Sequence, residues 1–264
     1  MFDEYLVRWN LIPDGDPIIT HSSRLLPVLY KGIPAMLKVA IEAEERWGSL
    51  LMVWWNGEGA APILAHEGDA LLMERAVGTA SLSEMAHSGH DDEASRIICA
   101  VAAKLHAVKG KPLPELLPLT GWFKELELAA ARNGGILSQA LAVTKELLAD
   151  PQDVVVLHGD IHHGNILDFG AHGWLAIDPK RLIGERAFDF ANIFCNPDME
   201  VAIQPGRLAR QVNIVAAAAN LERKRLLKWI LAYASLSAAW TLKEGKPANL
   251  ALSVAKLAAF ELEK

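Results

Sequence analysis

The sequence predicts an α+β fold in two lobes, a β-rich N-lobe followed by a mostly helical C-lobe. Short apolar runs separated by turn residues fill the chain up to Met73, and such runs form the strands of a meander. From Asp91 onward, apolar residues recur at the spacing of helices. The pattern changes near Val77, so we expect an N-lobe at residues 1–77 and a C-lobe at residues 78–264.

The composition excludes several classes of protein. A chain of 264 residues, 52% of them apolar, can bury a sizeable core in one large domain or two small lobes. Its net charge of −6 argues against a nucleic-acid partner, which requires a basic surface. The N-terminus does not resemble a signal peptide, and no apolar run reaches the roughly 18 residues of a membrane span. We therefore expect no membrane partner. Cys99 and Cys195 have no metal-ligand spacing and fit a reduced, cytoplasmic setting.

The N-lobe is expected to be a sheet with one acidic helix. Lys38 stands alone among apolar residues in one strand, and the helix begins near Ile41 and stops at Asn56 and Gly57. The predicted strands, each bounded by turn residues, are residues 5–12, 18–19, 25–30, 35–39, 61–66 and 70–73.

The C-lobe is expected to consist of helices around an aromatic core. Trp229, Tyr233 and Trp240 are assigned to that core, with the wall of a cleft as the alternative. The predicted helices are residues 91–108, 119–132 and 137–149, and three more after Arg207.

The stretch at residues 154–178 carries the strongest functional signal. Its opening apolar run is predicted to be a strand that delivers Asp160 into a loop, with Asn165 five positions later. A turn and a second apolar run then end on Asp178. Single Asp and Asn residues in loops most often cap turns. Two carboxylates and an amide together at strand ends, however, suit magnesium and a phosphate chain.

This joint pattern resembles the catalytic loop and metal-binding segment of protein kinases. Its opening, HGD in place of HRD, resembles the aminoglycoside phosphotransferase family. The continuation GWLAIDPKRLIGERAFDFANIFCNPD closely resembles the aminoglycoside 6-phosphotransferases, the streptomycin 6-kinase group. The likeness includes LPVLYKGIPAMLKVA near the start and LSAAW near the end, so it spans most of the chain.

The resemblance implies a two-lobe protein-kinase-like fold and an aminoglycoside O-phosphotransferase that uses ATP and Mg²⁺. Asp160 would position and deprotonate the acceptor hydroxyl. Asn165 and Asp178 would hold the magnesium ion through oxygen atoms. Lys38 would direct the nucleotide phosphates.

Several further residues are expected to bind the nucleotide. Ser22 and Ser23 lie in a turn that would cover the phosphates, although it has no Gly-x-Gly-x-x-Gly and an ordinary polar hairpin loop is an equal alternative. Glu45 is expected to pair with Lys38, with Glu44 as the reserve. By resemblance, the carbonyl group of Glu74 and the amide group of Ala76 would pair with the adenine edge.

The acceptor is expected to be small and cationic. Only about ten residues separate Asp178 from the next expected helix, and no Ala-Pro-Glu follows, so a peptide-docking segment has no room. The resemblance makes streptomycin, phosphorylated at its 6-hydroxyl, the leading acceptor. Its guanidinium groups would seek carboxylates such as Asp160, Glu185 or Asp198. We expect the enzyme to be a monomer.

Three alternatives stay open at this point. The chain can be a kinase for another small cationic metabolite or antibiotic, or a nucleotide-binding pseudokinase. A zinc site at His158, His162 and His163 is the third, although His158 is better explained as a residue that hydrogen-bonds the backbone and shapes the loop. Asp189 is expected to cap a helix or brace the catalytic loop, and His106 to be structural.

Overall fold

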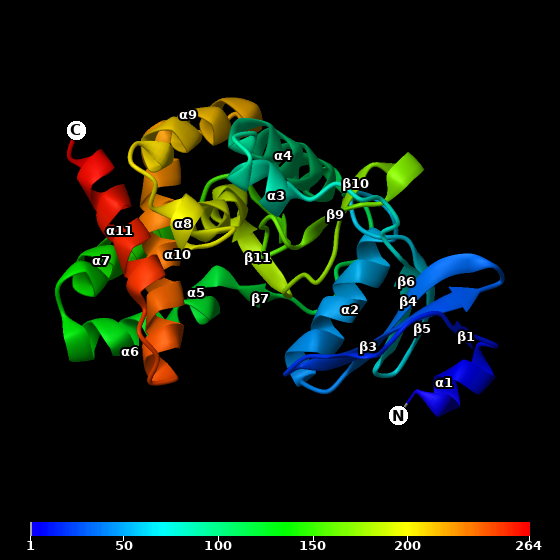
Figure 1. The fold of residues 1–264 in the computed structure, drawn as a ribbon. Helices are drawn as coiled ribbons and strands as arrows, with labels where there is room; N and C mark the ends of the chain where they lie inside the picture. Colours follow the sequence, from blue (N-terminus) through cyan, green and yellow to red (C-terminus); the bar gives the residue numbers. More distant parts are fainter. Residues whose placement is uncertain (1) are drawn as a thin grey trace.

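The computed structural model describes residues 2–264, and it places a sheet at one end of the molecule and a larger helical region at the other (Figure 1). The strands near the N-terminus, blue to cyan in Figure 1, form the sheet. The red C-terminal helix α11 (Asn249–Leu262) lies at the opposite end, beside the green helices α6 (Lys124–Asn133) and α7 (Ile136–Ala149). The predicted α+β class, with a β-rich N-lobe and a helical C-lobe, is confirmed.

The N-lobe sheet has six antiparallel strands in the order β1-β3-β4-β6-β5, with β2 paired to β3. Lys31 and Gly32, both with positive φ, form the tight turn between β3 and β4, as hairpins of this length require. The register sets Lys38 between Leu25 of β3 and Leu71 of β6. The strands are β1 (Ile12–Pro13), β2 (Ile18–Ile19), β3 (Ser23–Tyr30), β4 (Ile33–Ala40), β5 (Ile63–Glu67) and β6 (Ala70–Glu74).

The strand predicted at residues 5–12 is wrong, because Asp3–Arg8 forms helix α1. Two of the apolar residues that suggested a strand, Tyr5 and Trp9, lie instead one helical turn apart and contact each other. The rings of Tyr5 and Trp9 have centroids 5.3 Å apart, and both side chains pack against the core of the sheet. The other predicted N-lobe strands are confirmed within two residues.

Helix α2 (Ala43–Trp55) lies against the sheet and ends where predicted. Asn56 adopts a left-handed conformation with φ of 42°, which stops the helix. Trp55, at the last turn, is fully buried. The burial of Trp55 therefore fixes α2 relative to the strand that carries Lys38.

A short linker joins the sheet to the helices, and the predicted lobe boundary falls within it. The amide of Gly78 donates a hydrogen bond of 2.9 Å to the carbonyl of Asp168. A Cβ at Gly78 would lie only 2.0 Å from the Asp168 carboxylate carbon, so no larger residue fits. The short helix α3 (Leu82–His87), which follows, was not predicted.

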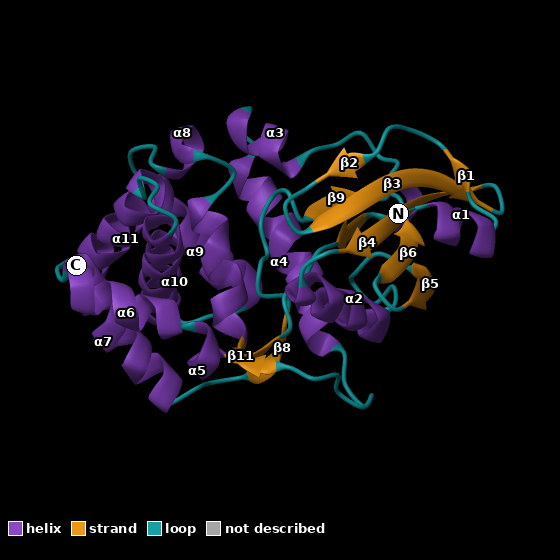
Figure 2. Ribbon diagram, turned by 90° about the horizontal axis from the view of Figure 1, so that it is seen from below, coloured by secondary structure: helices purple, strands orange, loops and turns teal. Residues whose placement is uncertain are grey.

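The C-lobe surrounds the long helix α10, which packs against α6, α7, α9 and α11 (Figure 2). Trp229 and Tyr233 of α10 are buried as predicted, whereas Trp240 is only partly buried. The helix predicted at residues 119–132 divides at Phe123, and the other predicted helices are confirmed. The helices are α4 (Asp91–Ala107), α5 (Leu119–Trp122), α6 (Lys124–Asn133), α7 (Ile136–Ala149), α8 (Met199–Ala202), α9 (Arg207–Ala219), α10 (Arg223–Lys243) and α11 (Asn249–Leu262).

Two small sheets carry the functional stretch of the sequence. Strands β8 (Val154–Leu157) and β10 (Trp174–Ala176) were predicted, and β9 (Ile166–Asp168) pairs with β10. Strand β11 (Leu182–Glu185), which was not predicted, lies between β8 and β7 (Leu117–Pro118). The 3₁₀ helix η2 (Arg186–Cys195) follows it. Within residues 2–264, no helix is both long enough and apolar enough to cross a bilayer.

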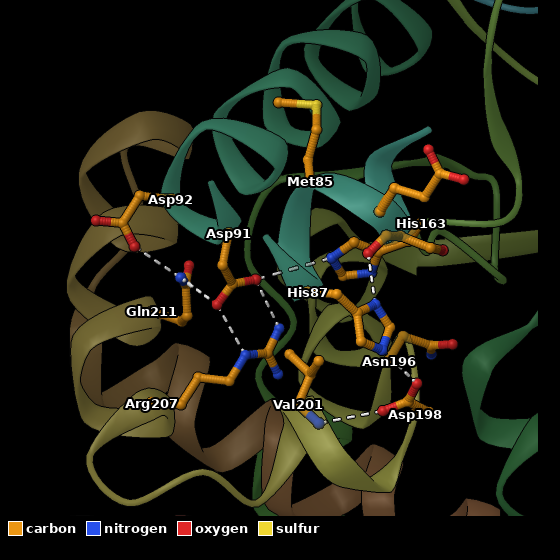
Figure 3. A network of polar contacts seen from close by, with 12 residues as sticks. Met85, His87, Asp91, Asp92, His163, Asn196, Asp198, Val201, Arg207 and Gln211 are labelled. Atoms are coloured by element: carbon orange, nitrogen blue, oxygen red, sulfur yellow. Dashed lines mark hydrogen bonds and ion pairs between the residues drawn. The ribbon is translucent and has the colours of Figure 1, made fainter. Parts of the chain in front are cut away.

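A buried charge cluster fastens α4 to α9 (Figure 3). The Asp91 carboxylate accepts hydrogen bonds of 2.8 and 2.9 Å from the Arg207 guanidinium and one of 2.6 Å from Gln211. The side chains of Asp91 and Arg207 are 5% and 2% exposed. Burial alone would raise the pKa of Asp91, but Arg207 holds it below its ordinary value.

We expect Arg207→Met to lower the free energy of unfolding by about 3–5 kcal/mol, because it leaves the Asp91 carboxylate buried without its partner. Denaturant titration measures this change. The matched control is Lys228→Met, which removes an exposed ion pair with Glu146 and should cost at most about 1 kcal/mol. Equal effects of the two variants would contradict the assigned role of the cluster.

Candidate active site

The loop between β8 and β9 holds Asp160 by both carboxylate oxygens. Asn192 of η2 donates a hydrogen bond of 2.8 Å to Oδ1. Asn165 donates to Oδ2 at 3.3 Å and to the Asp160 carbonyl at 2.9 Å. The structure thus brings two predicted residues together, Asp160 and Asn165. Asn192 was missed, and the FDFANIF motif that contains it was the available signal.

Asp189 holds the backbone of this loop in place, which confirms the structural role expected for it. Its carboxylate, 1% exposed, accepts backbone hydrogen bonds of 2.9 Å from His158 and 2.7 Å from Gly159. The ring of His106 lies 2.7 Å from the same carboxylate, so His106 is structural as expected. Two backbone amide donors therefore fix the loop just before Asp160, and the His106 ring contacts the carboxylate that accepts them.

His158 shapes the loop, as expected. Its Nε2 donates a hydrogen bond of 2.9 Å to the Ile177 carbonyl, and its Nδ1 accepts the Asp160 amide at 3.3 Å. The ring stacks on Trp55 at 6.1 Å between centroids. Burial lowers the pKa of His158, so the ring is neutral near pH 7. No group of three His, Cys, Asp or Glu in residues 2–264 has the geometry of a metal site, and the zinc alternative has no support.

A buried ion-pair cluster joins the two lobes at Lys38. The ammonium group lies 2.5 Å from Oδ1 of Asp178 and also pairs with Glu45. Burial alone would lower the pKa of Lys38, but these two carboxylates raise it above its ordinary value, so the charge is kept. The expected pairing with Glu45, rather than Glu44, is confirmed.

Asp178, two residues after the end of β10, has a strained backbone conformation. Its φ of 61° lies in the left-handed region, which a non-glycine residue rarely adopts. Burial alone would raise its pKa, but Lys38 and then Lys180 lower it, and the carboxylate is ionised at neutral pH. Such strain at an ionised side chain within a cleft is typical of functional sites.

A cavity of about 310 Å³ opens above this cluster. Its apolar part includes Leu25, Leu71 and Met73, and Lys38 is among the residues that line its polar part. The remaining predicted residues that line it are Ser22, Ser23, Asn165 and Asp178. An apolar wall beside a lysine and oxygen ligands can accommodate a base and its phosphates.

The residues predicted to bind the adenine edge lie beside this cavity. Glu74 and Ala76 follow Met73, which lines it, but neither is itself a lining residue. No backbone or side-chain acceptor within residues 2–264 receives the amide hydrogen of Ala76. Their contact with a nucleotide stays a prediction.

Asn165 and Asp178 have the donor atoms that magnesium prefers. The amide nitrogen of Asn165 is turned toward Asp160, which leaves its amide oxygen without a donor among the described residues. The Asp178 carboxylate already accommodates one cation, the Lys38 ammonium. Hard oxygen atoms with one ionised carboxylate fit Mg²⁺.

Glu185 does not bind the acceptor, so that expectation is wrong. Its side chain is 2% exposed and pairs with Arg225 through two bonds of 2.6 and 2.7 Å. The indole of Trp229 and the amide of Gln152 donate further bonds of 2.7 and 3.0 Å. Because both carboxylate oxygens are already bonded, no acceptor cation can reach them.

Asp198, the other candidate, is half exposed and holds a histidine (Figure 3). One oxygen caps α8 by accepting the Val201 amide at 3.1 Å, and the other lies 2.7 Å from Nε2 of His87. Nδ1 of His87 lies 2.7 Å from the carbonyl of Ser83. Both ring nitrogens face acceptors, an arrangement that favours the imidazolium form, in which both nitrogens donate.

We expect the pKa of His87 to lie above its ordinary value, since the Ser83 carbonyl and Asp198 stabilise the charged ring. The pair with Asp198 is then fully formed below about pH 6.5 and is lost as the pH rises through the folded-state pKa. An NMR titration of the His87 ring protons measures it. Asp198→Asn should lower that pKa, and an unchanged titration curve would contradict the pairing.

Comparison with known proteins identifies relatives along most of the chain. The family model described as aminoglycoside/hydroxyurea antibiotic resistance kinase matches residues 8–245. The chain is 51% identical to a streptomycin 3''-kinase of Klebsiella pneumoniae, over 90% of this chain and 91% of that protein. It is 29% identical to a streptomycin 6-kinase of Streptomyces griseus, over 90% of this chain and 81% of that protein.

Solved structures support the fold. A thermostable mutant of aminoglycoside phosphotransferase APH(4)-Ia, in a ternary complex with AMP-PNP and hygromycin B, superposes with a TM-score of 0.64. It shares 14% identity with this chain, and the match covers 98% of this chain and 95% of that one. The predicted two-lobe kinase-like fold is confirmed.

Proposed function

The chain belongs to the aminoglycoside/hydroxyurea antibiotic resistance kinase family, and we propose that it transfers a phosphoryl group from ATP to a hydroxyl of streptomycin. The single observation that carries this proposal is the convergence of Lys38, Asn165 and Asp178 on one cavity, with Asp160 bonded to Asn165 beside it. The carboxylates of Asp160 and Asp178 do not bond to each other. Asp178 would therefore be available for the metal and Asp160 for the acceptor hydroxyl.

The proposed roles follow from the contacts. Asp160 accepts the proton of the acceptor hydroxyl, and Asn192 and Asn165 hold its carboxylate in one orientation. Lys38 directs the nucleotide phosphates, and Glu45 keeps its ammonium in place. Asn165 and Asp178 would hold Mg²⁺, which would neutralise charge on the phosphate oxygens. Ser22 and Ser23 would cover the phosphates.

The choice of acceptor rests on the relatives and on charge. The more similar relative named here phosphorylates streptomycin at the 3'' position, and its identity of 51% exceeds the 29% shared with the 6-kinase. We therefore favour the 3''-hydroxyl. The 6-hydroxyl, which the sequence resemblance favoured, is the second candidate. Asp198 is proposed to bind a cationic group of the acceptor.

The state of the two cysteines bears on the cell compartment. Cys99 and Cys195 are unpaired and buried, and burial raises the pKa of each thiol to about 12. Such thiols fit the reduced cytoplasm. We propose a cytoplasmic monomer with its lobe boundary between residues 77 and 78.

Two alternatives make different predictions. A pseudokinase would bind nucleotide without needing Asp160, yet two asparagines orient that carboxylate. Another small cationic acceptor would leave the nucleotide site unchanged and alter only the product. Measuring transfer to defined acceptors separates both alternatives from the proposal.

We expect Asp160→Asn to lower kcat by about 10²–10⁴-fold, because the variant cannot accept the hydroxyl proton. ATP binding and thermal stability should stay close to those of the wild type, since the amide replaces the carboxylate with nearly equal volume. Steady-state kinetics and nucleotide titration measure both quantities. A kcat within a factor of two of the wild type would remove Asp160 from this role.

Purified enzyme with ATP and Mg²⁺ should add one phosphoryl group to streptomycin. Mass spectrometry detects the product, and phosphorus–proton NMR correlation identifies the modified hydroxyl. Expression in a sensitive bacterium should raise streptomycin tolerance, whereas expression of Asp160→Asn should not. Efficient phosphorylation of an unrelated alcohol, with streptomycin unmodified at millimolar concentration, would contradict the acceptor while leaving the kinase activity established.

A further inference from the structure

The catalytic loop contains no lysine or arginine that could stabilise the negative charge that develops during phosphoryl transfer. No Lys or Arg occurs between His158 and Asn165. Nδ1 of His158 and Nδ1 of His162 each accept a backbone amide hydrogen, so neither of these rings is an imidazolium. Negative charge spreads over the equatorial oxygens of the transferred group, and fixed cations normally stabilise it.

Lys180, two residues after Asp178, is held beside this loop. Its backbone amide donates a hydrogen bond of 2.7 Å to the carbonyl of His158. A Cβ on Gly159 would lie 3.0 Å from the Cβ of Lys180, so the lysine stem rests on the residue just before Asp160. Gly159 has φ of +82° and cannot readily be replaced.

Lys180 is not among the residues that line the cavity, but it follows Pro179, which is, and its ammonium approaches Glu45 of α2. The ammonium lies 3.9 Å from Oε1 of Glu45, beyond hydrogen-bond distance. The same oxygen accepts a hydrogen bond of 3.0 Å from Ser22, in the turn that lines the cavity. The side chain is 21% exposed, so solvent or a ligand can reach it.

The neighbouring basic residues, Arg181 and Lys38, already have close partners. The guanidinium of Arg181 stacks over Trp47 at 4.4 Å and pairs with Glu115 at 3.0 Å. Lys38 is bound by two carboxylates. Lys180 therefore differs from both, because its ammonium makes no hydrogen bond within residues 2–264 and its stem is fixed.

We propose that Lys180 is a catalytic residue whose ammonium binds an equatorial oxygen of the γ-phosphoryl group during its transfer to the acceptor hydroxyl. This inference rests on the proposed function. Two contacts support its position: the bond of its backbone amide to the loop that carries Asp160, and the approach of its ammonium to Glu45, the partner of Lys38.

The step is a displacement at the γ-phosphorus of ATP. The bond from phosphorus to the β,γ-bridging oxygen breaks, and its electron pair stays on ADP. The acceptor oxygen forms the new bond, and its proton passes to Asp160. Lys180 neither gains nor loses a proton; it donates a hydrogen bond to an oxygen whose negative charge grows in the transition state.

The test compares Lys180→Met and Lys180→Arg with the matched control Lys145→Met, an exposed lysine on α7. We expect Lys180→Met to lower kcat by about 10²–10³-fold, as for removal of one donor to a developing oxyanion. KM for each substrate and Kd for AMP-PNP should change less than about threefold, since the interaction strengthens only in the transition state. Lys180→Arg should recover at least a tenth of the wild-type kcat.

A purely structural lysine would give a different result. Loss of AMP-PNP affinity with unchanged kcat would mean that Lys180 only positions Glu45, and a kcat within threefold of the wild type would also overturn the proposal. If Lys180→Met does not fold, the same comparison is made with Lys180→Gln.

The acceptor proposal can fail separately. ATP hydrolysis with water as acceptor reports on Lys180 without any aminoglycoside, and the same loss in Lys180→Met is expected there. Wild-type enzyme that hydrolyses ATP but leaves streptomycin unmodified refutes only the acceptor. Wild-type enzyme that transfers phosphoryl to neither water nor any alcohol overturns both proposals.

Discussion

The carboxylate of Asp189 is the constraint on which the site depends. It satisfies the backbone amides of His158 and Gly159, which are buried and have no access to water. Each amide left unsatisfied would cost about 1–3 kcal/mol. Because η2 is a 3₁₀ helix with three residues per turn, Asn192 projects from the same face as Asp189. One face of one short helix therefore fixes both the loop backbone and the Asp160 carboxylate.

The nucleotide side of the cleft depends on a second constraint, the close approach of α2 to the segment after Asp178. A Cβ on Gly48 would lie 2.5 Å from the carbonyl oxygen of Pro179, so only glycine permits this packing. The approach brings Glu45, one turn earlier on α2, to Lys38. In this state Lys38 neutralises Asp178.

Sequence reasoning selected residues that the structure brings together where chemistry and local pattern coincide. Asp160, Asn165 and Asp178 lie within one stretch whose strands and turns are short and sharply bounded. Lys38 was recognisable as a lone charge in an apolar strand, although Asp178 is 140 positions away. The contact that removes Glu185 from the site could not be predicted, because Arg225 lies 40 positions later on a helix with no distinguishing motif. Helix α1 was misassigned because a six-residue segment is too short for its apolar spacing to distinguish helix from strand.

Because Glu185 pairs with Arg225, a cationic acceptor has one fewer carboxylate to bind. Asp198 is then the remaining carboxylate of the expected pair, and it already holds the His87 imidazolium. An acceptor guanidinium at Asp198 would exchange one cation for another, so the local charge would stay the same. Below the pKa of His87 the acceptor competes with this imidazolium, and above that pKa it meets an unpaired carboxylate. Acceptor affinity should therefore rise with pH across the titration of His87, whereas nucleotide binding, which involves no residue of that pair, should not follow it.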